Sequence, residues 1–245
     1  MKKRLLSIFL ACIMIFPTIP LAFASDSPTV DKCSSTMFAS GDNFKLTYKA
    51  TATYTVNGRQ VTKSDTEMYF NSLDDLLAFL AYISKEGKYV RNFNQKVTDP
   101  EFIVDTSVPY SIVIPLQNTS GSAVNGTVSK RVVISASSTN ETAGDTSDVY
   151  QICNPSGVAI LAEGSDALTH SITFTNGIEV QTGASLSLKN SIQLRTSAID
   201  YKFSGDVDVG GYLEFEGNPS SDTGAVTFES GSALKVQNGG EATIG

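Results

Sequence analysis

The chain has 245 residues, of which 41% are apolar and 18% charged, with 25 acids, 18 bases, one histidine, three cysteines and no tryptophan. The apolar content excludes a disordered tail, the few cysteines exclude a disulfide scaffold, and the surplus of acid is the reverse of what nucleic-acid binding requires. A single histidine excludes zinc sites built on several histidines and leaves His170 as the only base for a His-dependent triad.

The first 24 residues have the three parts of a secretory signal peptide. A basic start at 2–4 precedes an apolar run at 5–16, and a small-residue exit ends at Ala24. A membrane-spanning helix needs about 20 unbroken apolar residues, whereas Pro17 ends this run early. We therefore expect a secreted protein, with no membrane insertion after cleavage near Ala24.

Cleavage removes three bases and no acid, which leaves 15 bases against 25 acids. Such an acidic surface repels phosphate backbones, so we expect no nucleic-acid partner. Cys33 and Cys153 remain, and they either form one disulfide that stabilises the fold by about 2 to 4 kcal/mol or stay as buried thiols. Lipid attachment at Cys12 is the alternative to cleavage, and it is disfavoured because the residues after Cys12 stay apolar.

A hairpin and a helix are predicted before the main body of the chain. In the segment 25–70, residues 44–70 alternate on both sides of Asn57-Gly58, a pair that tolerates the positive φ angles of a type I′ turn. From Asn71 the apolar period changes to about 3.6, with Asn71 or Ser72 as the cap, which predicts a helix over 71–86 and a connection to 100. Its apolar stripe is Leu73, Leu76, Leu77, Leu80 and Ile83.

From residue 172 onward the chain is a series of short apolar pairs separated by small or turn residues. The pairs are Ile172/Phe174, Ile178/Val180, Leu186/Leu188, Ile192/Leu194, Tyr201/Phe203, Val207/Val209, Leu213/Phe215, Val226/Phe228, Leu234/Val236 and Ala242/Ile244. Positions 172, 192, 213 and 234 form one series with steps of about 20 residues, and 186, 207 and 226 form a second. Short strands that recur at this period are typical of a solenoid.

Two other all-β architectures fit this pattern less well. A β-sandwich has longer strands joined by hairpins, and a left-handed hexapeptide helix keeps a strict period of six. We therefore predict a mainly β protein in which a right-handed parallel β-helix over 101–245 follows the capping helix and the preceding hairpin.

The run Ser171–Asn190 contains the stretch Gly183-Ala184-Ser185-Leu186-Ser187-Leu188-Lys189-Asn190. It resembles the coils of bacterial surface proteins with pectate-lyase-like right-handed β-helices, and the helix at 71–86 resembles the one that closes their N-terminal end. The resemblance covers residues 71–245. It implies a right-handed parallel β-helix and a location at the bacterial cell surface, but no particular ligand. Since Ala242–Gly245 stops within a coil, we also expect truncation, with further solenoid coils in a longer chain.

Four outward acids are the weak catalytic candidates: Asp206, Asp208, Glu214 and Glu216. They alternate with apolar residues on strands that we expect to be neighbours, and paired carboxylates hydrolyse glycosides. Solvated acids on a secreted solenoid are the favoured interpretation, because outward acids recur in other coils. Asp206 and Asp208 are also weak calcium candidates, although the EF-hand pattern fails there. No other cofactor is expected.

A binding role fits the sequence better than catalysis. A stiff, exported, acidic rod suits adhesion to a host or matrix glycan or protein, and Tyr110, Tyr150, Tyr201 and Tyr212 would stack on sugars if exposed, although Tyr201 matches a core position. We expect His170 to be a surface hydrogen-bonding residue. The predicted function is a non-catalytic adhesin or structural stalk, and the alternative is a polysaccharide-cleaving hydrolase or lyase on a β-helix wall.

Overall fold

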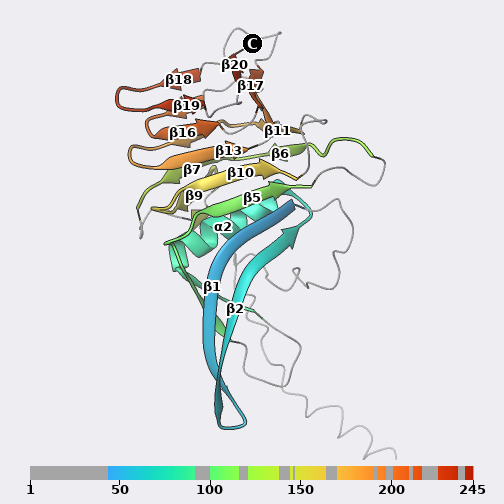
Figure 1. The fold of residues 1–245 in the computed structure, drawn as a ribbon, viewed down its shortest axis with the longest axis vertical. Helices are drawn as coiled ribbons and strands as arrows, with labels where there is room; N and C mark the ends of the chain where they lie inside the picture. Colours follow the sequence, from blue (N-terminus) through green and yellow to red (C-terminus); the bar gives the residue numbers. More distant parts are fainter. Residues whose placement is uncertain are drawn as a thin grey trace, which may run out of the picture.

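The computed structural model describes residues 44–91, 100–115, 121–137, 144–145, 147–163, 170–189, 192–196, 201–209, 212–216, 226–236 and 241–244. The predicted signal peptide, Cys12 and Cys33 lie outside these residues. The described chain is mainly β-structure with one α-helix (Figure 1). The expected β-rich fold class is therefore confirmed.

The predicted hairpin is present as two long antiparallel strands, β1 (Phe44–Val56) and β2 (Arg59–Phe70). Asn57 and Gly58 join them with φ angles of 51° and 76°. Positive φ at both central residues is the requirement of a type I′ turn, whose twist matches that of the strands it joins. The sequence pair therefore fixes the register at the tip of the hairpin.

The predicted helix is α2 (Leu73–Glu86), and Ser72 is its N-cap. The Ser72 hydroxyl accepts a hydrogen bond of 3.0 Å from the Asp75 N–H, which satisfies one of the free donors in the first turn. At the other end Gly87 adopts a left-handed φ of 66° and donates its N–H to the Ile83 carbonyl. The apolar stripe is buried, as predicted.

The other strands are short. They are β3 (Lys88–Val90), β4 (Glu101–Val104), β5 (Tyr110–Ile114), β6 (Gly126–Val128), β7 (Arg131–Ser135), β8 (Gly144–Asp145), β9 (Val149–Cys153), β10 (Val158–Ala162), β11 (His170–Phe174), β12 (Ile178–Val180), β13 (Ser185–Lys189), β14 (Ile192–Thr196), β15 (Tyr201–Phe203), β16 (Asp206–Val209), β17 (Tyr212–Glu216), β18 (Val226–Phe228), β19 (Leu234–Val236) and β20 (Glu241–Ile244).

From β10 onward the strands enter three sheets in strict rotation. The first sheet receives β10, β13, β16 and β19, the second receives β11, β14, β17 and β20, and the third receives β12, β15 and β18. Neighbours within each of these sets pair in parallel. Together with β5, β6, β7 and β9 these strands form a body that we call the stack (Figure 1).

Side chains alternate between the interior and the surface of the stack. On the surface of the first sheet Ser187 pairs with Asp208, and Asp208 pairs with Lys235. The residues that precede Ser187 and Asp208 on these strands are apolar. They are Leu186 and Val207, and both are fully buried. The short apolar pairs of the sequence therefore form continuous interior rows, because in-register parallel pairing places each side chain above its counterpart.

The last assignments of the 20-residue series are wrong. Leu234 pairs with Val207 and not with the strand of Leu213, which instead pairs with Ala242, while Val226 pairs with Tyr201. Nine residues of sequence separate β17 from β18, whereas two to four separate successive strands from β11 to β17. The regular spacing of about 20 residues therefore placed Leu234 in the second sheet with Leu213, whereas it lies in the first.

The first sheet changes from parallel to antiparallel pairing at β5. This strand is parallel to β10 on one side and antiparallel to β1 on the other. Next to β1 lies β4, which we placed at the start of the parallel region, and its pairs with β1 and β3 are antiparallel. The hairpin is thus continuous with the stack through the first sheet.

The helix α2 covers the end of the stack nearest the hairpin (Figure 1). Its first turn is joined to the stack through Asp74, whose Oδ1 accepts hydrogen bonds from the Tyr150 hydroxyl at 3.0 Å and from the Ser129 N–H at 2.9 Å. Leu73 and Leu77 face an interior lined by apolar residues such as Val132 and Ile152. No helix in the described ranges is long and apolar enough to cross a membrane.

Candidate functional site

A one-residue shift of register turns an acidic side chain into the interior at the base of the hairpin. The β1–β2 register changes between Thr47 and Ala50. On one side of the shift Met68 and Phe70 are the buried residues of β2, and on the other side Asp65 is buried, with 8% of its surface exposed. At this β-bulge two residues of β1 lie opposite one residue of β2, and the inward alternation of β2 changes there, which places Asp65 among apolar neighbours.

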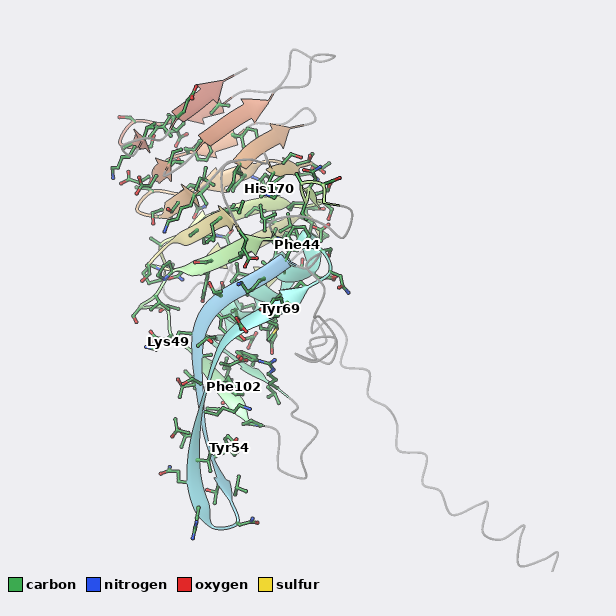
Figure 2. All side chains as sticks on the ribbon, turned by 45° about the vertical axis from the view of Figure 1, so that its right-hand side comes forward. Phe44, Lys49, Tyr54, Tyr69, Phe102 and His170 are labelled. Atoms are coloured by element: carbon green, nitrogen blue, oxygen red, sulfur yellow. The ribbon has the colours of Figure 1, made fainter. Side chains whose placement is uncertain are left out.

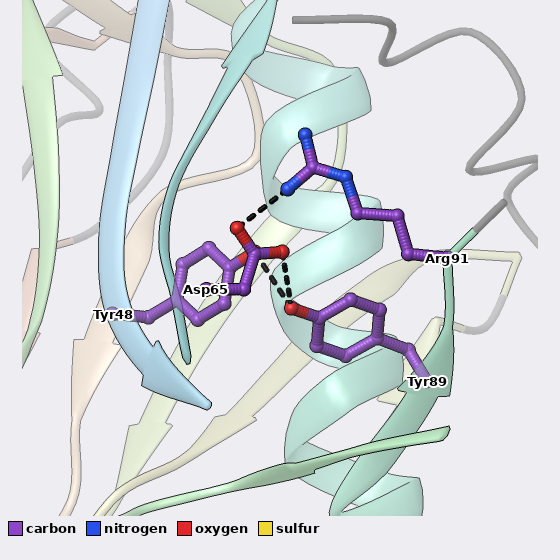
Figure 3. Close-up of polar contacts among 4 residues, drawn as sticks. All are labelled: Tyr48, Asp65, Tyr89 and Arg91. Carbon is purple, nitrogen blue, oxygen red and sulfur yellow. Dashed lines mark hydrogen bonds and ion pairs between the residues drawn. The ribbon is translucent and has the colours of Figure 1, made fainter. Parts of the chain in front are cut away.

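Three side chains converge on the Asp65 carboxylate (Figure 3). The hydroxyls of Tyr48 and Tyr89 donate to Oδ2 at 2.9 Å and 2.6 Å, and the two hydroxyl oxygens lie 2.9 Å from each other. The Arg91 guanidinium forms an ion pair with Oδ1. We call these four residues the Asp65 cluster. It joins β1 and β2 to the segment that contains β3.

Aromatic rings surround the Asp65 cluster. The Tyr89 ring stacks on Phe102 with centroids 5.3 Å apart, and it meets Phe79 of α2 edge-on at 5.5 Å. The Tyr48 ring lies 6.3 Å from Phe79. An apolar wall of this kind excludes water and strengthens the hydrogen bonds inside it, provided that every polar group has a partner.

The protonation states of the cluster follow from burial and from the Asp65 charge. Burial and the nearby carboxylate raise the pKa of Tyr48 far above its ordinary value, and burial and the adjacent Tyr48 raise the pKa of Tyr89 in the same direction. Burial alone would lower the pKa of Arg91, but the hydrogen bond and charge of Asp65 raise it overall. Near neutral pH the tyrosines are neutral donors and Arg91 is a cation.

This arrangement can anchor the hairpin but has no group poised for catalysis. The Asp65 carboxylate already accepts two hydroxyl hydrogen bonds and an ion pair, and the tyrosines cannot ionise readily. Sequence reasoning missed the cluster, because strict alternation along β2 from Phe70 and Met68 would place Asp65 on the outer face.

The four predicted acids are divided between two sheets. Asp206 and Asp208 lie on β16 in the first sheet and alternate with buried valines, as predicted. Asp206 forms an ion pair with Lys235. Glu214 and Glu216 lie on β17 in the second sheet, and their side chains fall outside the description. The expectation that these two pairs of acids occupy neighbouring strands is therefore wrong. In the sheets β16 lies beside β13 and β19, and β17 lies beside β14 and β20.

The predicted calcium ligands Asp206 and Asp208 and one of the two remaining cysteines lie within the described residues. Within the described residues, no group of three or more His, Cys, Asp or Glu side chains is placed to hold a metal ion. The calcium site at Asp206 and Asp208 stays a prediction. Cys153 is buried, and its pairing with Cys33 also stays a prediction because Cys33 lies outside the described residues.

His170 is a core residue and not the expected surface residue. It is 1% exposed, and its Nδ1 lies 3.1 Å from the Val124 carbonyl oxygen. The reason is its position on β11, where it shares the inward alternation of Ile172 and Phe174. It serves as a satisfied hydrogen-bonding residue inside the stack.

The predicted sugar-stacking tyrosines are also interior residues where their side chains are described. Tyr110 and Tyr201 are fully buried and Tyr150 is 3% exposed, so none of these rings is available to a glycan. The side chain of Tyr212 lies outside the description. The core position expected for Tyr201 is confirmed.

Comparisons with protein families, with curated proteins and with solved structures give no match to this chain. The resemblance to pectate-lyase-like surface proteins therefore rests on the sequence pattern alone and stays a prediction.

Proposed function

We propose that this protein is an exported, surface-associated right-handed parallel β-helix that acts as a non-catalytic adhesin or structural stalk. The observation that carries the proposal is the strict rotation of short strands through three sheets, with each strand in register with the strand one turn earlier. In such an architecture each turn contacts only its neighbours, so added turns extend the body in one direction. A stiff extended body suits a spacer or a binding rod.

The chemistry of the outer wall supports a structural role. Three ion pairs connect successive turns there: Arg131–Glu179, Lys202–Glu229 and Lys235–Asp206. Hydrolysis of a glycoside needs an acid and a second carboxylate that face each other across the bond. Carboxylates neutralised by lysine or arginine on the next turn are poorly arranged for that purpose.

The interior beneath α2 supports the same conclusion. Its lining residues are all leucine, isoleucine, valine or phenylalanine, and Leu77, Ile152 and Phe174 are among them. A substrate site combines an apolar pocket with a few placed polar groups, which this space lacks. The helix thus covers this end of the stack, and the described lining beneath it offers no polar group to a ligand.

Export is the part of the proposal that rests on the first 24 residues and on the acidic composition that follows them. The partners that we propose for the exported protein are a host or matrix glycan or protein. An acidic surface keeps such a protein soluble and disfavours anionic polymers as ligands.

The test combines binding with catalysis on the same ligands. The purified protein is applied to a glycan array, and reducing-sugar release is measured on the same polysaccharides. We expect no release above that of a heat-denatured sample. Sustained release that is lost in Asp206→Asn with Asp208→Asn, but kept in the matched outward variant Glu229→Gln, would replace the proposal with a hydrolase.

A further inference from the structure

The tip of the hairpin projects from the body as a two-stranded arm, which we define as residues 53–64 (Figures 1 and 2). The last pair between β1 and β4 is at Thr51, so the arm begins where the rest of the sheet ends. Among the described strands β2 pairs only with β1. All residues of β2 within the arm are exposed. One edge of the arm therefore offers a row of backbone donors and acceptors to solvent.

The two faces of the arm differ in chemistry. The register pairs Thr53 with Thr62, Tyr54 with Val61, Thr55 with Gln60, and Val56 with Arg59. Because side chains alternate along a strand, one face carries only hydroxyl and amide groups, namely Thr53, Thr55, Gln60 and Thr62. The other, which we call the cationic face, carries Tyr54, Val56, Arg59, Val61 and Lys63.

The cationic face continues the buried side of the sheet beyond the body. Tyr48, Ala50 and Ala52 lie on the same side of β1 and are buried against the core, whereas Val61 on the arm is 36% exposed. Apolar residues thus run from the core onto a solvent-exposed ribbon. A two-stranded ribbon is marginally stable in water, and this makes a third strand at its edge favourable.

The charge of the arm is opposite to that of the remaining chain. The arm contains two bases and no acid, while the other residues include 25 acids and 16 bases. On β2 the residues of the cationic face follow the order Arg59, Val61, Lys63, at steps of two. A strand added beside β2 would place its own alternate side chains next to these three.

We infer that the edge of β2 in the arm binds an extended peptide segment of another protein with the pattern acid-x-apolar-x-acid. Backbone hydrogen bonds to the β2 edge supply affinity, and the match of two carboxylates and one apolar side chain to Arg59, Lys63 and Val61 supplies specificity. An anionic polysaccharide would meet the two cations, but it can use neither the regular row of backbone groups nor Val61. The inference concerns the arm alone and holds independently of the proposed stalk role.

The test uses two synthetic peptides, each blocked at both ends. The first has the sequence TDTVTDTW and the second, TKTVTKTW, differs only in its charges. Because the protein has no tryptophan, the fluorescence of the peptide tryptophan reports binding directly. We expect the intact protein to bind the acidic peptide at least about tenfold more tightly than the basic one, and added salt to reduce this difference.

Charge reversal supplies the decisive variant. Arg59→Glu with Lys63→Glu should reverse the preference, so that the basic peptide binds more tightly. The matched control is Gln60→Glu with Thr62→Glu, which adds two charges to the other face of the same strand and should keep the preference for the acidic peptide. Far-UV circular dichroism verifies that both variants fold.

Two results would overturn the inference. Equal affinity of the intact protein for both peptides, including no binding of either, contradicts the charge pattern. Binding of oligogalacturonate without binding of the acidic peptide would assign the arm to an anionic glycan instead.

Discussion

Asp65 and Arg91 form an ion pair whose side chains are only 10% and 11% exposed, at the point where the hairpin arm joins the body. Asp65 lies on β2 and Arg91 directly follows β3, so the pair connects β2 to a segment whose strand is not paired with it in the sheet. The hydroxyls of Tyr48 and Tyr89 complete the coordination of the carboxylate. The base of the arm is therefore fixed, whereas its tip extends into solvent.

Removing the Asp65 charge should destabilise the protein strongly. Asp65→Asn removes the carboxylate that pairs with the buried Arg91 guanidinium and accepts hydrogen bonds from both tyrosine hydroxyls, and we expect a loss of about 3 kcal/mol in the free energy of unfolding. Urea denaturation followed by circular dichroism measures it. Glu101→Gln, which removes the exposed ion pair with Lys88, is the control and should cost far less. Equal losses in the two variants would show that the Asp65 cluster is not the anchor we describe.

The N-cap of α2 gives a second prediction. Ser72→Ala removes the acceptor for the Asp75 N–H and should lower the stability by about 1 kcal/mol, whereas Asn71→Ala should have almost no effect. Thermal unfolding of the two variants separates the roles of these adjacent residues, between which the sequence could not choose. A larger effect at Asn71 than at Ser72 would contradict the observed cap.

Alkaline pH should unfold the protein cooperatively. Burial raises the pKa of Tyr110 to about 12, and burial together with the Asp65 charge raises that of Tyr48 further. A raised pKa in the folded state means stability that is complete below about pH 10, the value for unfolded tyrosine, and is lost as pH rises above it. Absorbance at 295 nm should therefore show a late, steep phase of ionisation from the buried tyrosines, and this phase should coincide with the loss of circular dichroism. Ionisation of all nine tyrosines near pH 10 without unfolding would contradict the burial.

Two glycines test the close contacts between turns of the stack. A Cβ at position 205 would lie 2.4 Å from the Ala184 carbonyl oxygen and 2.5 Å from that of Gln181. Gly205→Ala should therefore cost about 2 kcal/mol or more, because backbone must move. At Gly231, where φ is 93° and the space is open, alanine adds only conformational strain of about 1 kcal/mol. Denaturant unfolding compares the two, and a smaller loss at Gly205 would contradict the packing at this corner.

Local sequence patterns predicted the elements that depend on nearby residues. The hairpin turn needs only Asn57-Gly58, the helix needs its apolar stripe and a cap, and the short strands need alternating apolar pairs. In each case the deciding interactions lie within a few residues along the chain, so the local sequence pattern is sufficient to predict the element.

The features that the sequence did not reveal depend on register between distant segments. The bulge that buries Asp65 shifts one strand against another and leaves no local signal in β2. The position of Leu234 depends on how many residues separate the preceding strands. The burial of His170 depends on where β11 begins. Each requires knowledge of which strand lies alongside.

The central claim is the in-register stacking of strands from successive turns, and engineered disulfides test it most directly. In a chain with Cys33 and Cys153 replaced by alanine, Ser187→Cys and Asp208→Cys occupy directly paired positions on β13 and β16. Paired Cα atoms of neighbouring strands lie about 5 Å apart, within disulfide range, whereas Ser187→Cys with Asp206→Cys is displaced by two residues to about 8 Å. Mild oxidation followed by mass spectrometry should find the disulfide in the first variant and none in the second. A disulfide in the displaced pair, or its absence from the paired positions, would contradict the three-sheet stack.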